Sequence, residues 1–304
     1  MAAAQAPPHV APTSKTTRAE VTSSGVGSRA SHIRALALVL GPGGVVGTAW
    51  LLGLAAGLRE EGVELAEAET IVGTSAGSIV AALVARGSDL LDLADSVASR
   101  GEEPALITDA AVTSEVFAIM QDAADADPVQ ARQRAGRAAL RANTSPAEAR
   151  IERMAELVGT GPWPHQGLLI PTVDAESGMP RVWSVGDGVP VHLAVTASTA
   201  MPGLSAPIPI SGRRYFDGAF RKGANADLTA AADTLLMIEP LGHVFHTPAP
   251  DGPTMVLRIG PDEASLTAFG NDLHDLARWP ATFDAGMTQA STIADAVGTV
   301  WITR

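Results

Sequence analysis

The chain has 304 residues, 46% of them hydrophobic and 18% charged, so it can bury the core of one large domain or two small ones. Its net charge of −12 argues against a nucleic-acid-binding protein and against electrostatic docking on anionic membranes, since both need clustered lysine and arginine. The sequence contains no cysteine, which excludes disulfides, a thiol nucleophile and thiolate metal ligands.

The N-terminal segment, residues 1–31, is rich in Ala, Pro, Ser and Thr and has no unbroken apolar stretch. It is therefore predicted to be a disordered tail rather than a signal peptide. No later stretch offers the ~18 consecutive apolar residues of a membrane-spanning helix. We expect one folded domain over residues 32–304, in the cytoplasm or peripheral to a membrane.

Two strand-turn-helix units follow. Residues 35–40 form a short apolar run that ends at glycine, as expected of a strand buried on both faces, and residues 48–59 then favour a buried helix. Residues 70–72 and 75–86 repeat this order. Two such units predict a parallel sheet with helices on its faces, whose active site lies at the carboxyl ends of the strands.

The character of the sequence changes over about residues 89–161, which are alanine-rich and charged and carry no strand signal. We expect a helical insertion that caps the domain. Within it, Ser145 and Glu148 have the spacing of a capping box with proline at the first helical position. The helix that follows would present one apolar side, made by Ile151, Met154, Leu157 and Val158.

The rest of the chain returns to strands and ends in a helix. Strands are expected at residues 168–170, 181–185, 234–238 and 255–259, and a helix over about residues 262–301.

A candidate nucleophile lies in Gly73-Thr74-Ser75-Ala76-Gly77, between the second strand and its helix. A serine at such a turn is held out from the backbone above the helix N-terminus, and small residues on both sides avoid clashes in the strained elbow. Alone, this pattern also fits an ordinary buried serine turn. Its position after an apolar strand and before a helix favours the nucleophile.

The earlier turn, Gly41-Pro42-Gly43-Gly44-Val45-Val46-Gly47, also opens a helix and offers bare backbone N–H groups that could hold an oxyanion. It is not a dinucleotide fingerprint, because Val46 stands where a glycine is needed, and it lacks the Gly-Lys-Ser/Thr of a P-loop. The plain alternative is a tight turn whose glycines permit close packing. Pro42 has no N–H and cannot donate.

Further along, Asp217-Gly218-Ala219 alone is only a turn signal. Together, however, the three motifs resemble the patatin-like phospholipase family, which carries a glycine-rich oxyanion turn, a Gly-X-Ser-X-Gly elbow and an Asp-Gly turn in this order. Two further stretches match the family, residues 197–203 and 225–228. The resemblance spans about residues 35–301 and is weakest between 89 and 166.

The resemblance implies a three-layer α/β/α fold with a mainly parallel central sheet and the helical insertion. It implies a lipid acyl hydrolase of phospholipase A or esterase type, acting on lipid or acyl-ester substrates without metal or organic cofactor. Ser75 would be the nucleophile and Asp217 the base, with an acyl-enzyme intermediate. The remaining residues implied are the oxyanion donors Gly43, Gly44 and Ala76 and the motif glycines Gly47, Gly73, Gly77 and Gly218.

One departure bears on substrate choice: Val46 stands where the family usually has a basic residue. We therefore expect no marked preference for anionic phospholipids over neutral acyl esters, and transient contact with a membrane surface. Three alternatives stay open. They are a transacylase on the same dyad, a Ser-His-Asp esterase that uses His243, His246 or His274, and a catalytically silent lipid-binding protein. The sequence does not indicate the oligomeric state.

Overall fold

The structure is a computed structural model that describes residues 22–23, 35–98, 107–122 and 127–301. Of the tail predicted to be disordered, only Thr22–Ser23 lies within the described residues, where it forms a short strand. The strands are β1 (Thr22–Ser23), β2 (Leu36–Leu40), β3 (Thr70–Gly73), β4 (Leu168–Asp174), β5 (Pro180–Trp183), β6 (Ile208–Ile210), β7 (Arg213–Asp217), β8 (Thr234–Ile238) and β9 (Met255–Ile259).

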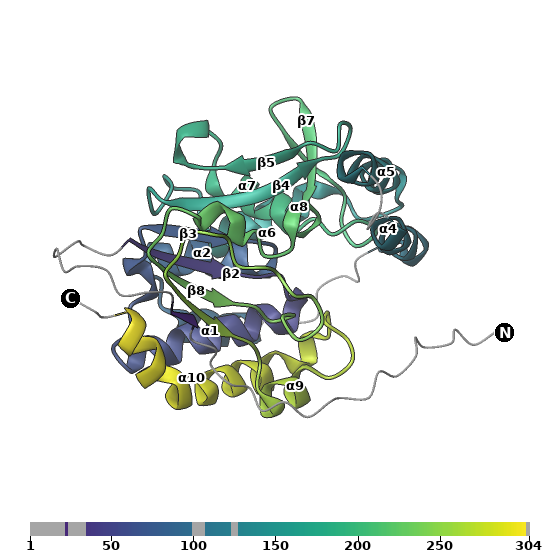
Figure 1. Cartoon of the computed structure of the whole chain (residues 1–304). Helices are drawn as coiled ribbons and strands as arrows, with labels where there is room; N and C mark the ends of the chain where they lie inside the picture. The colour runs from purple at the N-terminus through teal and green to yellow at the C-terminus, as the bar shows by residue number, and fades with distance from the viewer. Residues whose placement is uncertain (1–21, 24–34, 99–106, 123–126, 302–304) are drawn as a thin grey trace.

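These strands form a mixed sheet whose centre is parallel. Strands β9, β8, β2, β3 and β4 lie side by side in that order and run parallel (Figure 1). The edges are antiparallel: β1 pairs with β9, while β5 and β7 pair with β4, and β6 pairs with β7. The predicted parallel sheet is confirmed, and the antiparallel β6 and β7 are additions that the sequence did not predict.

Different segments of the chain pack against the two faces of the sheet. Leu38, Leu40 and Ile71 belong to the large core that includes the helices after β2 and β3. The alternate residues Ala37 and Val39 face the other way, because successive side chains of a strand point to opposite faces. They pack in a second core with residues of the segment 224–232. Both faces are thus buried, as the continuous apolar runs predicted.

Ten α-helices and four short 3₁₀ helices surround the sheet in the described residues. The α-helices are α1 (Gly44–Glu60), α2 (Ala76–Arg86), α3 (Leu90–Ala98), α4 (Ala110–Asp122), α5 (Pro128–Arg141), α6 (Ala147–Val158), α7 (Val191–Ser198), α8 (Ala219–Lys222), α9 (Glu263–Phe269) and α10 (Trp279–Trp301). The 3₁₀ helices are η1 (Leu65–Glu67), η3 (Val185–Asp187), η4 (Ala226–Thr229) and η5 (Leu276–Arg278).

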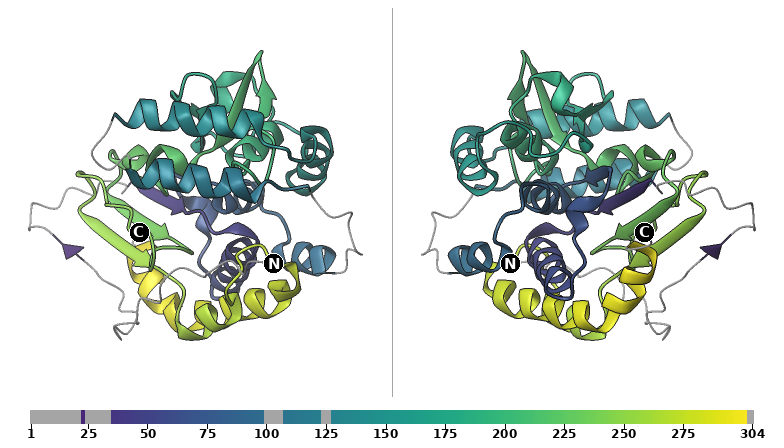
Figure 2. Two further views of the ribbon diagram at one scale, coloured as in Figure 1. Left: turned by 90° about the vertical axis from the view of Figure 1, so that its right-hand side faces the viewer. Right: turned by 90° about the vertical axis from the view of Figure 1, so that its left-hand side faces the viewer.

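The N-terminal helix α1 and the C-terminal helix α10 lie side by side, as both views of Figure 2 show. Glycines allow this close approach: a Cβ on Gly53 would lie 2.1 Å from the Phe283 carbonyl oxygen. The buried Trp50 indole N–H donates to Ser265 Oγ and Gln289 Oε1, which ties α1 to α9 and α10. The two ends of the described fold are therefore packed into one core.

The described part of the predicted insertion is helical, and its helices occupy three places, of which the first is that of α3 against α1 and α10. Helices α4 and α5 pack on each other and on Val173 and Phe216 of the sheet, whereas α6 packs against α7 and α2. The capping box was wrong. Pro146 is the N-cap of α6, and Ser145 Oγ instead accepts a hydrogen bond from the Ile107 N–H at 2.8 Å.

The C-terminal helix predicted over residues 262–301 is divided into α9, η5 and α10. Helix α9 ends at Gly270, which has φ +66°, and Asp275 caps η5 by accepting from the Ala277 N–H at 3.0 Å. The loop between α9 and η5 returns the chain to the carboxyl ends of the strands, where it contacts the glycine-rich turn before α1.

Candidate active site

Ser75 stands on a strained elbow between β3 and α2. Its backbone has φ 52° and ψ −122°, a region that residues other than glycine seldom adopt. The elbow closes tightly: a Cβ on Gly77 would lie 2.0 Å from the Leu40 carbonyl oxygen, and one on Gly73 would lie 2.6 Å from Ala81 Cβ. Both glycines of the motif are therefore required by contact, and Ser75 remains partly exposed.

Asp217 is brought beside Ser75 at the end of β7. The Ser75 hydroxyl donates to Asp217 Oδ2 at 2.7 Å, with no histidine between them. The other carboxyl oxygen, Oδ1, accepts from the Ala219 N–H at 2.8 Å. Asp217 is 3% exposed, and burial raises the pKa of its carboxyl to about 6, against the effect of the Ala219 and Ser75 hydrogen bonds and of the Arg150 charge.

The glycine-rich turn lies against the serine elbow, since the Gly41 carbonyl oxygen accepts from the Gly77 N–H at 3.1 Å. The N–H groups of Val45 and Val46 both donate to the Leu273 carbonyl oxygen, at 2.8 and 3.2 Å. Within the described residues, no acceptor takes the N–H of Gly43, Gly44 or Ala76. These N–H groups begin α1 and α2, where the helix dipoles favour negative charge, so the turn can accommodate an oxyanion.

The end of α7 and the turn that follows it support both Ser75 and Asp217. Ser198 Oγ accepts from the Ser75 N–H at 3.1 Å, while the Ser198 carbonyl oxygen accepts from the Gly218 N–H at 3.3 Å. Two residues later, the Ala200 carbonyl oxygen accepts from the Asp217 N–H at 3.1 Å. One short segment thus fixes the spacing of the two candidate catalytic groups.

Asn225 joins the serine turn to the aspartate turn a second time. It is fully buried with φ 62°, and its amide Nδ2 lies 3.0 Å from Thr74 Oγ1 and 3.1 Å from the Gly218 carbonyl oxygen. Arg221 donates to Asn225 Oδ1 at 2.9 Å and pairs with both carboxyl oxygens of Asp227. Residues 225–228, which were predicted to support the loop of Asp217, are therefore hydrogen-bonded to that loop through Asn225.

Arg150 of α6 is a residue near the site that sequence reasoning missed. Its Nη2 donates to the Thr199 carbonyl oxygen at 2.8 Å, between the two residues that hold Ser75 and Asp217. Its Nε is buried and has no hydrogen-bond partner among the described residues. Burial lowers the pKa of Arg150 to about 10, so the guanidinium remains charged at neutral pH. A lone arginine in a helical insertion carries no sequence signal.

In the described part of the chain, the hydrogen bonds of the Ser75 and Asp217 side chains involve no histidine. His274 belongs to the loop whose Leu273 holds the glycine-rich turn. His243, His246 and His274 are loop residues that are exposed overall. Partial desolvation of the imidazole rings lowers the pKa values of His243 and His274. Within the described ranges, no three His, Asp or Glu side chains are grouped as metal ligands usually are. No helix in the same ranges is both long and apolar enough to cross a membrane.

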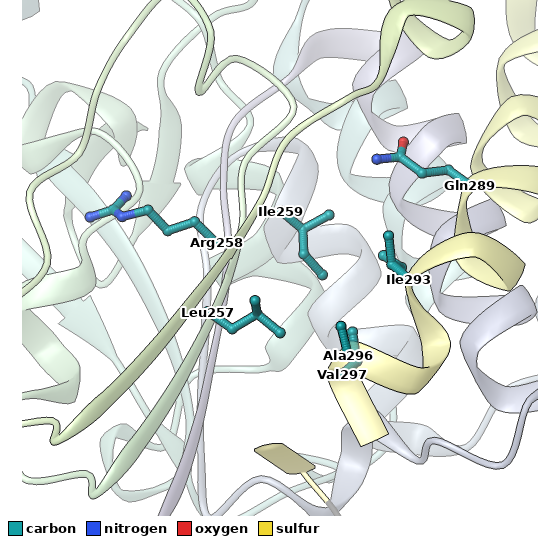
Figure 3. A pocket seen from close by; sticks show the side chains of 7 residues that line it. All are labelled: Leu257, Arg258, Ile259, Gln289, Ile293, Ala296 and Val297. Carbon is teal, nitrogen blue, oxygen red and sulfur yellow. The ribbon is translucent and has the colours of Figure 1, made fainter. Parts of the chain in front are cut away.

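The hollow drawn in Figure 3 lies elsewhere, between β9 and α10. Its volume is about 40 Å³, far below the ~300–1,000 Å³ of a typical ligand pocket. Its lining is mainly apolar and contains no serine or carboxylate: Leu257, Arg258, Ile259, Gln289, Ile293, Ala296 and Val297. We do not assign it to the reaction.

Comparison with known proteins agrees with this architecture. Residues 38–230, more than half of the chain, match the family described as patatin-like phospholipase, so the chain belongs to that family. Curated protein sequences give no match.

Comparison with solved structures gives two matches of low similarity. The crystal structure of VipD from Legionella pneumophila has 13% identity and a TM-score of 0.44, with 86% of this chain and 67% of that chain covered. The crystal structure of the type III effector protein ExoU has 16% identity and a TM-score of 0.35, covering 86% and 53%. The mainly parallel sheet with flanking helices is that of the family.

Proposed function

We propose that this protein hydrolyses lipid acyl esters with Ser75 as nucleophile and Asp217 as general base. Family membership supports lipid acyl hydrolysis in general. The observation that carries the particular residues is the 2.7 Å hydrogen bond from the Ser75 hydroxyl to a buried carboxylate. A serine hydroxyl needs a base within hydrogen-bond reach, and a carboxyl whose pKa is about 6 is a better base than an ordinary aspartate while still ionised at neutral pH.

The reaction runs in two halves. Ser75 Oγ attacks the ester carbonyl carbon as its proton passes to Asp217, and the carbonyl oxygen becomes an oxyanion held by the N–H groups of Gly43, Gly44 and Ala76. Each such donor typically contributes ~3 kcal/mol to the transition state. The intermediate collapses, the alcohol leaves with the proton from Asp217, and acyl-Ser75 remains. Water then attacks the acyl carbon as its proton passes to Asp217. The bond from that carbon to Ser75 Oγ breaks, Asp217 returns the proton to Ser75 Oγ, and the carboxylic acid is released.

A fluorophosphonate probe tests the nucleophile. We expect the wild-type protein to be labelled and Ser75→Ala to lose labelling and ester hydrolysis together, because the probe reacts with an activated serine hydroxyl. The measurement is gel fluorescence of the labelled protein, with circular dichroism to confirm that the variant is folded.

The matched control is Ser114→Ala, which removes an exposed serine hydroxyl on α4 and should leave labelling unchanged. Equal labelling of Ser75→Ala would place the nucleophile elsewhere. A wild-type protein that is folded but neither labelled nor active would favour a silent lipid-binding role. Transfer of the acyl group to an added alcohol in preference to water would favour a transacylase.

A further inference from the structure

A second feature of the site is the cation Arg150, which forms no salt bridge in the described part of the chain although its charge acts on the carboxylate of Asp217. Arg150 reaches from α6 to the segment that supports Ser75 and Asp217, and the hydrogen bond that it makes within the described residues is to the Thr199 carbonyl oxygen. Within the described residues it forms no ion pair, and its buried Nε has no acceptor. Other arginines of the same chain are paired: Arg213 with Asp174, and Arg221 with Asp227. A partly buried guanidinium that is neither paired nor fully hydrogen-bonded is costly.

The position of Arg150 relative to the reacting groups follows from three consecutive residues. Ser198 holds the Ser75 N–H, Thr199 holds the Arg150 guanidinium, and Ala200 holds the Asp217 N–H. The guanidinium therefore contacts the segment that holds both reacting groups. Its charge also acts on Asp217 and on His274, whose loop holds the glycine-rich turn.

The chemistry of guanidinium defines what could complete this arrangement. Its planar fork of N–H donors matches the oxygens of a phosphate or a carboxylate, and such charge-assisted pairs are the strong hydrogen bonds of proteins. A second carboxylate beside Asp217 would oppose its ionisation. Among the described residues, no carboxylate forms a salt bridge with Arg150. An anionic group on a bound ester would supply the missing acceptor without remaining in the free enzyme.

We propose that Arg150 binds the oxyanion of a phosphate or carboxylate that lies close to the scissile ester of the substrate. This inference rests on the proposed function and specifies its substrate class: acyl esters that carry a nearby anionic group, such as phosphoglycerides. Arg150 enters the site from α6 and not from the glycine-rich turn. The proposal therefore opposes the expectation, drawn from Val46 and the acidic net charge, of no marked preference for anionic phospholipids.

The first experiment measures binding without turnover. In a Ser75→Ala background, isothermal titration calorimetry with monomeric dihexanoyl phosphatidic acid should show binding that Arg150→Gln weakens by about 10- to 100-fold. Arg150→Lys keeps the charge but not the fork and should fall between. Inorganic phosphate, titrated separately, should compete weakly, which distinguishes the lipid headgroup from free phosphate as the preferred ligand.

The second experiment measures selectivity. Neutral and carboxylate-bearing p-nitrophenyl esters of equal chain length are compared at pH 8.5, where Asp217 is ionised. Arg150→Gln should lower kcat/KM for the anionic ester by about 10- to 100-fold more than for the neutral ester, mainly through KM. The control Arg134→Gln removes an exposed arginine of α5 and should change neither.

The outcomes separate the two proposals. Equal losses on both esters, or equal binding of the phosphatidic acid by Arg150→Gln, would show that Arg150 only supports the Thr199 segment. If the wild-type protein hydrolysed neither ester but its Ser75→Ala variant bound the lipid through Arg150, the proposed function would fail and the anion site would stand. If Arg150→Gln did not fold, the graded loss in Arg150→Lys would carry the test, and no difference there would refute it.

Discussion

Asp217 is the residue whose environment most directly controls the proposed reaction. Its carboxyl is buried, yet it receives the Ser75 hydroxyl and the Ala219 N–H, so burial raises its pKa while the hydrogen bonds and Arg150 limit the rise to about 6. A base must be ionised to accept a proton. The pKa therefore sets the lower pH limit of the reaction.

We expect kcat/KM for a neutral monomeric ester to rise about tenfold per pH unit below pH 6 and to level off above it. Arg150→Gln should move this acidic limb to higher pH, because the cation that stabilises the carboxylate is removed. Stopped assays between pH 4 and 9 measure the profile. His274→Gln should leave it unchanged, and loss of the limb in that variant would instead favour a histidine base.

The same buried carboxyl should affect stability. A pKa raised from 3.8 to about 6 means that the native state holds the proton more tightly than the unfolded chain. The contribution of this group to stability is thus fully present below pH 4 and is lost as pH rises through 6, by about 3 kcal/mol. Asp217→Asn should accordingly be inactive but have a higher Tm than wild type at pH 8.

This gain should shrink at pH 4.5, where the wild-type carboxyl is largely protonated in the native state. Differential scanning calorimetry at the two pH values measures it. If the Tm of Asp217→Asn were lower than that of wild type by the same amount at pH 4.5 and pH 8, the expectation would be wrong. The hydrogen bonds and Arg150 would then stabilise the ionised carboxylate by more than burial destabilises it.

At this scale the sequence could predict the residues whose identity is fixed by backbone geometry. Gly73 and Gly77 have no room for a side chain, so these positions are restricted to glycine and can be recognised in the sequence. Ser75 and Asp217 were predicted from the Gly-X-Ser-X-Gly and Asp-Gly motifs, and the structure brings them together. Arg150 could not be predicted. Its role depends on where α6 packs, which no local pattern of an alanine-rich helix records.

Among the elements, helices α1 and α10 are packed so closely that little change is tolerated between them. Gly53 of α1 faces the backbone of α10 so closely that a methyl group would meet the Phe283 carbonyl oxygen at 2.1 Å. One helix must move away from the other, opening the core around Trp50. We expect Gly53→Ala to destabilise the protein by about 2–4 kcal/mol, although alanine favours an isolated helix.

Urea unfolding followed by circular dichroism measures this loss. Gly161→Ala is the control, because a Cβ at Gly161 meets no atom within 4 Å and should change stability by less than about 0.5 kcal/mol. Equal stability of Gly53→Ala and wild type would mean that α10 is not held against α1 in solution.

The elements themselves were predicted where the pattern is strong and local. The apolar runs that became β2, β3, β8 and β9 and the helices α1 and α2 were found, while β6 and β7 were not. Strand β7 begins with two arginines and forms an antiparallel edge, so it lacks the continuous apolar pattern of a central strand. The capping box failed because Ser145 had a distant partner, Ile107.

For the whole molecule, the family match covers only part of the structural unit. It ends at residue 230, yet β8 pairs with β2 in the centre of the sheet and α10 packs along α1. We therefore propose a single domain over residues 32–304, in which the C-terminal elements complete the sheet and its helical layer.

The charge of the whole molecule should oppose its adsorption to anionic membranes. With a net charge of −12, the protein is repelled by anionic vesicles at low ionic strength, and salt weakens this repulsion. We expect co-sedimentation with zwitterionic vesicles to equal or exceed that with anionic vesicles, with the anionic fraction rising as salt is added. Strong anionic binding that salt abolishes would require a basic surface. The proposed role of Arg150 is different, because it binds the anionic group of a substrate molecule that is already in the site and does not attract the protein to a membrane.

The contact between Leu273 and the glycine-rich turn has an evolutionary consequence. Gly44 has φ +65°, and a methyl group on it would lie 2.7 Å from the Leu273 carbonyl oxygen that accepts from the next two N–H groups. The conformation of the glycine-rich turn is thus held by Leu273, which lies 43 residues beyond the end of the family match. In relatives that keep this loop, position 44 should be restricted to glycine. In relatives where the loop is shortened or replaced, the turn should have acquired a different brace, so the two segments should co-vary.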